Sequence, residues 1–236
     1  MAKVQISALA ARLGINLKQQ PNMAELFDQL TTRSALAKIG KNFHRRGWMA
    51  GTAGNLSARS NNSENCFWIT SSGLPKGQLD NHDFILIDYK SNEISHRFYE
   101  NAKPSAETCI HSAIYSLFPD ARACFHIHSV DACIATSRVA TEQQQMLLPP
   151  LEMIKGLGIW QQNPEVNLSL FDNLLDVADI SQQIQTRFKQ NPPEIPALMI
   201  RDHGMTVWGN SMQQAYNRVE IIEFIMSYMA RTTSQL

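Results

Sequence analysis

The feature that most restricts how this chain can fold is the segment ACFHIHSV at residues 123–130, which places two histidines inside an apolar run. In a β-strand, residues two positions apart point to the same face, so His126 and His128 would project together while Phe125 and Ile127 face the other way. Two parallel imidazoles could bind a metal ion, or they could be polar residues on the open face of an edge strand. The segment predicts a strand and leaves both roles open.

Length and composition narrow the class of protein. The 236 residues suffice for a substantial hydrophobic core, and 44% of them are hydrophobic, which is typical of a globular chain. Basic and acidic residues number 21 each, so no global charge attracts nucleic acid or a membrane surface. A small anionic ligand would therefore need a local pocket of hydrogen-bond donors.

The cysteines and the N-terminal segment predict a cytoplasmic protein. Four cysteines occur without any C-x-x-C pair, a pattern that favours reduced thiols over a disulfide framework. The first 22 residues carry Arg12 in the middle of their apolar segment, which is too short and too charged for a signal peptide or a membrane span. We expect this extension to form a short amphipathic helix.

Hydrophobic periodicity predicts one domain over residues 1–236, with helices on either side of clustered strands. Such a pattern is typical of a three-layer α/β or α+β sheet protein, although it does not reveal the strand order. Helices are expected over 23–46, from Ser105 to about 117, over 176–189 and over 211–231; strands are expected over 66–70, 84–88, 93–99, 195–201 and 205–208.

Glycines and small hydroxyl residues gather in two segments, GTAGNLS at 51–57 and TSSGLPKG at 70–77. Backbone N–H groups in such turns can form an anion-binding nest, and Lys76 could add a positive charge. Ordinary loops have the same composition, so that alternative stays open. Neither segment has the spacing of a P-loop, and no G-x-G-x-x-G follows a strand, so nucleotide binding is not supported.

A third histidine, His203, lies between two predicted strands in the sequence Asp202-His203-Gly204. Three neutral imidazoles are a set that catalytic zinc uses while one coordination position stays open. A turn histidine without a ligand role is the alternative. The remaining histidines are expected to be surface residues or satisfied core residues; they are His44, His82, His96 and His111.

Two glutamates are candidates for acid–base chemistry. Glu107 falls in the first turn of the helix that begins at Ser105, where the helix dipole favours the ionised form. Glu152 lies in the apolar segment PPLEMIKG, which would raise its pKa if the side chain were buried, as general acid–base catalysis near neutral pH requires. A helix-start glutamate and a solvated loop glutamate are the respective alternatives.

Five short motifs occur in a fixed order across roughly residues 25–230. They are Gly54-Asn55-Leu56-Ser57, Ser71-Ser72-Gly73, Lys103-Pro104-Ser105-Ala106-Glu107, His126-Ile127-His128 and His203-Gly204. In this order they resemble the class II, zinc-dependent aldolase family, which includes fuculose-phosphate aldolase and ribulose-phosphate 4-epimerase.

The resemblance implies a central, mostly antiparallel sheet between helical layers, and a homotetramer with active sites at subunit interfaces. It also implies one Zn²⁺ per subunit, held by His126, His128 and His203, and a sugar-phosphate substrate. The family's phosphate-binding positions match Asn55, Ser72, Gly73 and Ser105, with Lys76 as an addition. Ala106 replaces the second serine of the family's Pro-Ser-Ser-Glu motif, so one phosphate donor is missing.

Two further segments, LEMIKG at 151–156 and RDHGMTVWG at 201–209, are most similar to a dehydratase of this family. They imply a hydro-lyase that removes water from a 2-ketose 1-phosphate carrying a methylthio group, a step of methionine salvage. Glu152 would be the acid–base residue, and Glu107 would assist it or shape the metal's open site. Two alternatives remain: an aldolase or epimerase that uses Glu107, and a non-catalytic interaction protein with the same fold.

Overall fold

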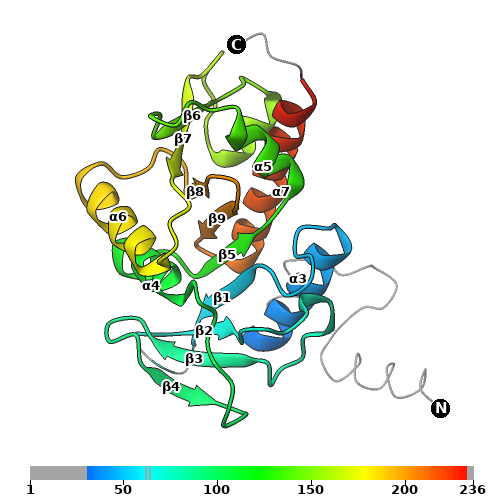
Figure 1. Cartoon of the computed structure of the whole chain (residues 1–236), viewed down its shortest axis with the longest axis vertical. Coiled ribbons are helices and arrows are strands. Elements are labelled where there is room, and N and C mark those ends of the chain that lie inside the picture. The colour runs from blue at the N-terminus through cyan, green and yellow to red at the C-terminus, as the bar shows by residue number, and fades with distance from the viewer. Residues whose placement is uncertain (1–30, 62, 64, 233–236) are drawn as a thin grey trace, which may run out of the picture.

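The computed structural model describes residues 31–61, 63 and 65–232; the predicted N-terminal helix and residues 23–30 of the next one lie outside this part. The described strands form one sheet of nine in the order β4-β3-β2-β1-β5-β9-β8-β7-β6 (Figure 1). The strands are β1 Asn55–Arg59, β2 Cys66–Thr70, β3 Phe84–Asp88, β4 Ile94–Arg97, β5 Ala123–Ile127, β6 Gln145–Leu148, β7 Val166–Phe171, β8 Ala197–Ile200 and β9 Gly204–Gly209. Neighbouring strands are antiparallel except β7 and β8, which are parallel.

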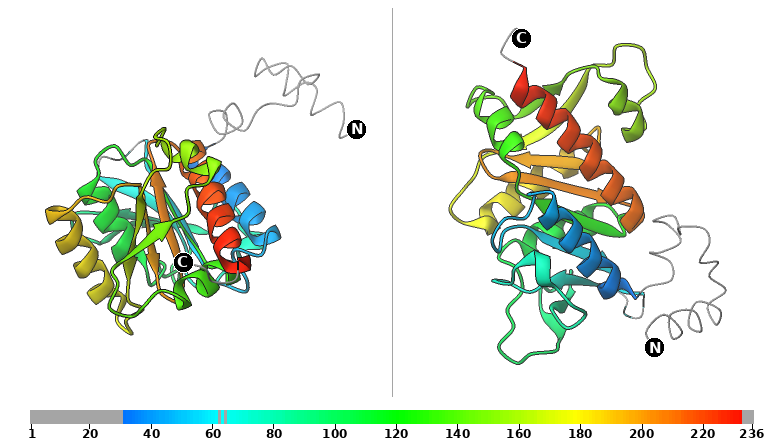
Figure 2. Two further views of the ribbon diagram at one scale, coloured as in Figure 1. Left: turned by 90° about the horizontal axis from the view of Figure 1, so that it is seen from above. Right: turned by 90° about the vertical axis from the view of Figure 1, so that its right-hand side faces the viewer.

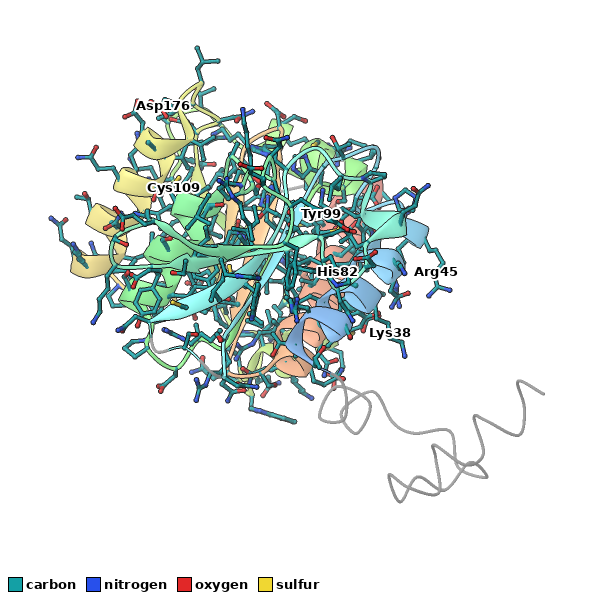
Figure 3. The ribbon with its side chains drawn as sticks, turned by 90° about the horizontal axis from the view of Figure 1, so that it is seen from below. Lys38, Arg45, His82, Tyr99, Cys109 and Asp176 are labelled. Carbon is teal, nitrogen blue, oxygen red and sulfur yellow. The ribbon has the colours of Figure 1, made fainter. Side chains whose placement is uncertain are left out.

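Helices cover both faces of this sheet. The helices are α3 Thr32–Arg45, α4 Thr108–Leu117, α5 Val130–Ser137, α6 Val177–Gln190 and α7 Met212–Arg231, with short 3₁₀ turns η1 Lys76–Gln78 and η2 Glu152–Leu157. Helices α4 and α6 pack together on one face, whereas α3, α5 and α7 lie on the other (Figures 1 and 2). In Figure 3, Cys109 of α4 accordingly lies across the sheet from Lys38 and Arg45 of α3. The predicted three-layer, mostly antiparallel sheet is confirmed.

Strand β5 shows how the sequence divides the core into two layers. Its odd-numbered residues, Phe125 and Ile127 among them, join the cluster on the side of α3 and α7. Cys124 faces the other way and joins the cluster beneath α4 and α6. Since side chains alternate along a strand, His126 points to the α4 side, where it finds polar partners.

Several boundaries differ from the prediction. The histidine strand ends at Ile127, because Ser129 caps helix α5 by accepting a hydrogen bond from the Ala132 N–H at 3.0 Å. The helix expected from Ser105 begins at Thr108, with Glu107 at the cap position. Residues 55–57, interpreted as part of a loop, belong to β1. Strands β6 and β7 and helix α5 were not predicted.

All four cysteines are free thiols. None of the helices in the described part of the chain is long and apolar enough to cross a membrane.

Candidate active site

The centre of the sheet places three polar residues side by side on its α4 face. Asn55 of β1 pairs in register with His126 of β5, and His126 pairs with Thr206 of β9. All three are buried. Because His128 follows the end of β5 and its N–H donates to the Trp48 carbonyl at 2.9 Å, its ring stays beside that of His126.

The turn between β8 and β9 brings His203 to the same place. A Cβ on Gly204 would lie 2.1 Å from the Ile127 carbonyl oxygen, so only glycine allows β9 to lie this close to the end of β5. Asp202, at φ +49°, adopts the left-handed conformation that completes the turn. The sequence Asp-His-Gly is therefore what carries the third histidine to the other two.

Four side chains meet at this point: His126, His128, His203 and Glu107. Their potential ligand atoms all lie within 4.8 Å of one another. Nε2 of His126 is 3.0 Å from Nε2 of His128, and Nε2 of His203 is 3.0 Å from Oε1 of Glu107. Oε2 of Glu107 is 3.4 Å from Nε2 of His126. The structure therefore brings together the three histidines and the first of the two glutamates selected from the sequence.

Hydrogen bonds on the far side of two rings orient their Nε2 atoms toward the centre. Nδ1 of His203 lies 3.2 Å from the Oδ1 of Asn173, which can only accept, so His203 carries its proton on Nδ1. Nδ1 of His126 lies 3.0 Å from the Thr206 hydroxyl. Such outer partners fix the tautomer of metal-binding histidines, and neither Asn173 nor Thr206 was selected from the sequence.

Electrostatics favour neutral imidazoles beside a carboxylate anion. Burial, with smaller contributions from the two other histidines, lowers the pKa of His128 to about 3. Burial alone would raise the pKa of Glu107, but the neighbouring His126 and His203 and the amide of Asn55 outweigh it and hold that pKa below its ordinary value. These are the protonation states in which both side chains can bind a cation.

This donor set fits a divalent metal ion. Three imidazole nitrogens converge, and Oε1 of Glu107 is buried without a hydrogen-bond partner. A buried acceptor in that condition is costly unless another group satisfies it. Three histidines with a nearby carboxylate suit zinc or a similar borderline ion better than magnesium or calcium, which prefer all-oxygen sites.

A buried polar chain lies behind Glu107 and includes a histidine that the sequence analysis set aside. Asn55 contacts Glu107 on one side and His111 on the other. His111 is one helical turn after Glu107, and Ser57 is two residues after Asn55, so each pair shares a face. That spacing was the signal that could have linked His111 to the site.

The two glycine-rich segments and the Lys103–Glu107 segment come together next to the histidines. The N–H of Ser72 donates to the Lys103 carbonyl at 2.8 Å, and Gly73 takes a positive φ of 75° that leaves it exposed in the turn. Ser105 lies next to this contact, two residues before Glu107, and its hydroxyl accepts a hydrogen bond from the Glu107 N–H at 3.4 Å. The structure thus brings the serine and glycine candidates for phosphate binding close to the histidine centre, in a group of loops that we call the loop edge.

Lys76 is buried rather than extended into this edge. Its Nζ donates to the carbonyls of Thr52 at 2.7 Å and Leu74 at 2.8 Å, one from each glycine-rich segment. Burial lowers its pKa to about 8. Lys76 therefore links the two loops, and its positive charge lies close enough to contribute to the lowered pKa of His128.

Glu152 lies apart from the histidines in the single chain. It begins η2, its side chain is 81% exposed, and its Oε1 accepts from the Nζ of Lys155 at 2.8 Å. Ile154 turns inward instead. The apolar surroundings expected around Glu152 are therefore not present within one subunit, because η2 presents this carboxylate to solvent.

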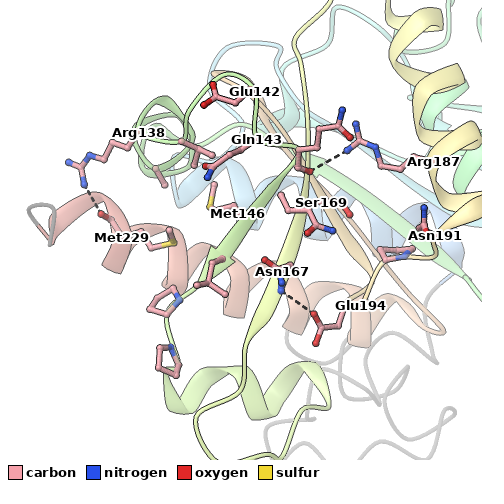
Figure 4. A pocket seen from close by; sticks show the side chains of 18 of the residues that line it. Arg138, Glu142, Gln143, Met146, Asn167, Ser169, Arg187, Asn191, Glu194 and Met229 are labelled. Carbon is pink, nitrogen blue, oxygen red and sulfur yellow. Dashed lines mark hydrogen bonds between the residues drawn. The ribbon is translucent and has the colours of Figure 1, made fainter. Parts of the chain in front are cut away.

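A cavity of about 1370 Å³ lies elsewhere, among α5, the β6–β7 pair and the end of α7 (Figure 4). Its two arginines are engaged with the protein: Arg138 donates to the Met229 carbonyl at 2.7 Å and Arg187 to the Leu170 carbonyl at 2.7 Å. None of the four converging side chains lines it. The candidate chemistry therefore belongs to the histidine centre and not to this cavity.

Known proteins were compared with the chain. Residues 34–229 match the family described as Class II Aldolase and Adducin N-terminal domain. A methylthioribulose-1-phosphate dehydratase of Microcystis aeruginosa is 49% identical over 199 residues, which are 84% of this chain and 94% of that protein. The enzyme of the same name from Leptospira biflexa is 36% identical over 207 residues, covering 86% of this chain and 99% of that protein.

Solved structures agree on the fold. YgbL of Escherichia coli superimposes with a TM-score of 0.71 at 23% identity, covering 86% of this chain and 90% of that one. An L-fuculose 1-phosphate aldolase gives a TM-score of 0.66 at 19% identity, covering 84% of both chains. With the family match over most of its length and relatives well above 30% identity, this chain belongs to the class II aldolase and adducin N-terminal domain family.

Proposed function

We propose that this protein is a metal-dependent hydro-lyase that dehydrates 5-methylthioribulose 1-phosphate to 5-methylthio-2,3-diketopentyl 1-phosphate in methionine salvage. The observation that carries the proposal is the convergence of three histidines and Glu107 in a chain 49% identical to a protein with that activity in its name. A binding role without chemistry would not need a buried carboxylate with an unpartnered oxygen at such a centre.

Zinc is the metal we propose, one ion per subunit, held by His126, His128 and His203. Bound there, it would act as a Lewis acid that stabilises negative charge developing on the substrate's carbonyl oxygen. Glu107 sits beside the three imidazoles and shapes the position left open to substrate.

The reaction removes a proton from C3 and the hydroxyl from C4, and the resulting enol tautomerises to the diketone. The chain must supply a base for the first proton and an acid for the departing hydroxyl, which leaves as water. We assign this work to Glu152, with Glu107 in an assisting role. One carboxylate can serve both steps, because the proton it accepts at C3 is the one it returns at C4.

Since Glu152 is exposed and lies outside the histidine centre, we propose that it reaches the substrate from a neighbouring subunit of a homotetramer. The ion pair with Lys155 is a surface pair, which contributes little and can be exchanged for contacts at an interface. An interface would also exclude water from Glu152, as the acid–base role requires.

The phosphate group is proposed to bind at this loop edge, next to the histidine centre. The residues that would contact it are Asn55, Ser72, Gly73 and Ser105. Support comes from the Ser72–Lys103 hydrogen bond, which places these groups next to Glu107. Asn55 uses one of its two amide hydrogens on Glu107, so the other is available to a phosphate oxygen. The charge of Lys76 beneath the loops adds attraction without direct contact.

Product identity tests the proposal. We expect zinc-loaded protein incubated with 5-methylthioribulose 1-phosphate to yield the diketone phosphate, seen as a new ³¹P resonance and, in ¹H spectra, as loss of the C3 proton signal and appearance of a C4 methylene signal. Dihydroxyacetone phosphate would instead identify an aldolase, and a phosphorylated epimer would identify an epimerase. Full zinc occupancy without turnover would favour the interaction role.

The aldolase alternative has one observation in its favour, which is that Glu107 is the carboxylate already at the centre. The two glutamates separate the alternatives. In a dehydratase Glu152→Gln should lower kcat more than Glu107→Gln, whereas in an aldolase the order should be reversed.

A further inference from the structure

A continuous chain of hydrogen bonds runs through the protein interior and ends on Glu107. Tyr115 OH lies 2.8 Å from the Ser57 hydroxyl, which lies 2.6 Å from Nδ1 of His111. Nε2 of His111 is 2.5 Å from Oδ1 of Asn55, and Nδ2 of Asn55 is 2.5 Å from Oε2 of Glu107. Two of these residues come from β1 and three from α4 or its cap, so the chain also joins the sheet to the helix.

Every member of this chain is shielded from solvent. Ser57 and His111 are 0% exposed, Tyr115 is 1% and Asn55 is 2% exposed. Without bulk water, each donor and acceptor needs a partner within the site, and the shortest contacts here are those between neighbours in the chain. The positions of the protons are therefore coupled from one end to the other.

The contact between Asn55 and Glu107 determines the direction in which hydrogen bonds are donated along this chain. Nδ2 of Asn55 faces Glu107 and its Oδ1 faces His111, so Asn55 donates one amide hydrogen to the carboxylate and its carbonyl oxygen accepts from His111. That oxygen can only accept, so His111 must carry its proton on Nε2. Nδ1 then accepts from Ser57, at 2.6 Å rather than the 3.2 Å that separates the same hydroxyl from the Cys124 carbonyl.

We propose that Tyr115, Ser57, His111 and Asn55 form a one-directional chain of hydrogen-bond donors that locks His111 in the neutral Nε2–H tautomer and holds Glu107 in place at the histidine centre. The proposal rests on the proposed function in one respect, which is that Glu107 shapes the position left open to substrate at the histidine centre. His111 is thus a positioning residue that acts through Asn55. A chain running the other way would require a protonated Glu107 and would move the His111 proton to Nδ1.

The first test reads the tautomer directly and needs no turnover. In long-range ¹H–¹⁵N spectra of the ¹⁵N-labelled protein, metal-free and zinc-loaded, we expect a protonated Nε2 and an unprotonated Nδ1 for His111 between pH 6 and 8. Assignment comes from loss of the signals in His111→Phe. An Nδ1–H tautomer or a charged ring over this range would overturn the proposal, whereas failure of the protein to dehydrate its substrate would leave this result unaffected.

The second test measures the positioning effect as zinc affinity, by competition with a chelator. Loss of a residue that orients metal-site groups typically weakens metal binding 10–100-fold, so we expect His111→Phe to weaken it by about that factor. His111→Gln keeps an N–H donor at the position of Nε2 and should restore most of the affinity. Phe preserves the ring that faces Phe67 at 6.5 Å, which limits loss of packing.

Ser112→Ala is the matched control. Ser112 is the next residue of α4, is also buried, and its hydroxyl has no hydrogen-bond partner. The Ser112→Ala substitution should leave the zinc affinity unchanged. Equal zinc affinity in wild type, His111→Phe and Ser112→Ala would overturn the positioning role. If His111→Phe fails to fold, His111→Gln is compared with Asn55→Ala instead. Of these two variants, only Asn55→Ala should lose zinc affinity.

Discussion

At the residue scale, the three histidines of the centre are held to different degrees. His126 is fully buried within β5 and is bonded to Thr206, so its removal also disturbs the sheet. His128 follows the end of the strand and is partly exposed; its backbone N–H donates to Trp48, and its ring contacts the other histidines of the centre. His128 is therefore the proposed ligand whose loss should be easiest to separate from loss of the fold.

We expect His128→Ala to lower bound zinc well below one equivalent per chain while the thermal midpoint of the metal-free protein changes little. His126→Ala should lose zinc too, with a lower midpoint. Metal analysis by mass spectrometry and calorimetry measure the two effects. His82→Ala is the control, because His82 is exposed and its partner Asp80 lies far from the centre in a separate turn; zinc loss in that variant alone would contradict the assignment.

A second residue-scale feature is the buried carboxyl of Glu223 on α7. It accepts a hydrogen bond from Ser129, the cap of α5, at 2.8 Å and is 4% exposed. Burial, reinforced by Asp131, raises its pKa to about 7, although Ser129 and Arg231 act in the opposite direction. The folded state therefore binds this proton more tightly than the unfolded state does.

The sign of the pH effect follows from that difference. Between the ordinary value of 4.5 and about 7, the folded protein keeps the Glu223 proton while the unfolded chain has lost it, so stability falls as pH rises. We expect the free energy of unfolding of Glu223→Gln to equal that of wild type near pH 4.5. At pH 8 it should exceed the wild-type value, by about 3 kcal/mol at most. Urea unfolding of both metal-free proteins across this range gives the difference, and a difference independent of pH would contradict the prediction.

At the element scale, the helices that were predicted well are those with local signals. Helix α7 begins after Ser211, whose hydroxyl accepts from the Gln214 N–H at 3.1 Å, and α6 begins after Asp176. Such caps act between residues two or three positions apart and can be seen in the sequence.

Elements whose polar residues serve the site were harder to predict. Strand β1 begins Asn-Leu-Ser, a composition typical of loops, because Asn55 and Ser57 face the buried chain and not an apolar layer. His111 was set aside for the same reason. Its partners come from a strand 54 and 56 residues away, and no local pattern reports such contacts. The three histidines that converge could be selected from the sequence because they lie in compact motifs; the groups that orient them could not.

The turn between β8 and β9 gives a prediction at this scale. In Gly204→Ala the new Cβ would meet the Ile127 carbonyl at 2.1 Å, so β9 must move away from β5. We expect a loss of several kcal/mol in the free energy of unfolding, together with weaker zinc binding, because His203 moves with the turn.

Gly51→Ala is the comparison that isolates backbone strain. Gly51 has a positive φ of 60°, which Gly204 does not have, and nothing lies within 4 Å of a Cβ added to it. The Gly51→Ala substitution should therefore lower the free energy of unfolding by only about 1 kcal/mol. Denaturant unfolding and chelator competition measure both variants, and equal losses would show that the approach of β9 to β5 is not what requires glycine at position 204.

At the scale of the whole molecule, exposed apolar side chains occur on two helices that pack together, α5 and α7. Val130 and Ile134 of α5 are 73% and 37% exposed, and Phe224 and Tyr228 of α7, which packs against α5, are 52% and 44% exposed. Residues four positions apart lie on one face of a helix, so each pair forms a continuous strip. A strip of this kind starting two residues after His128 fits a subunit contact that borders the active site.

If Glu152 acts across such a contact, two inactive variants should restore each other. Glu152→Gln alone should lower kcat by about 10²–10⁴-fold, and His128→Ala should lose turnover with its metal. When the two are co-expressed with different tags and mixed oligomers are isolated, some subunits with intact histidines lie next to a subunit with an intact Glu152. With random assembly, half of the sites keep their histidines and half of those meet a wild-type Glu152, so roughly one quarter of wild-type turnover should return.

The control pairs His128→Ala with His203→Ala. Both residues belong to the centre within one chain, so every subunit of that mixture is defective and no activity should return. If Glu152 instead acted on its own subunit's centre, the Glu152→Gln and His128→Ala mixture would be as inactive as this control, because each chain would still lack one essential group. The turnover of the mixed oligomers therefore decides between a site within one subunit and a site shared by two.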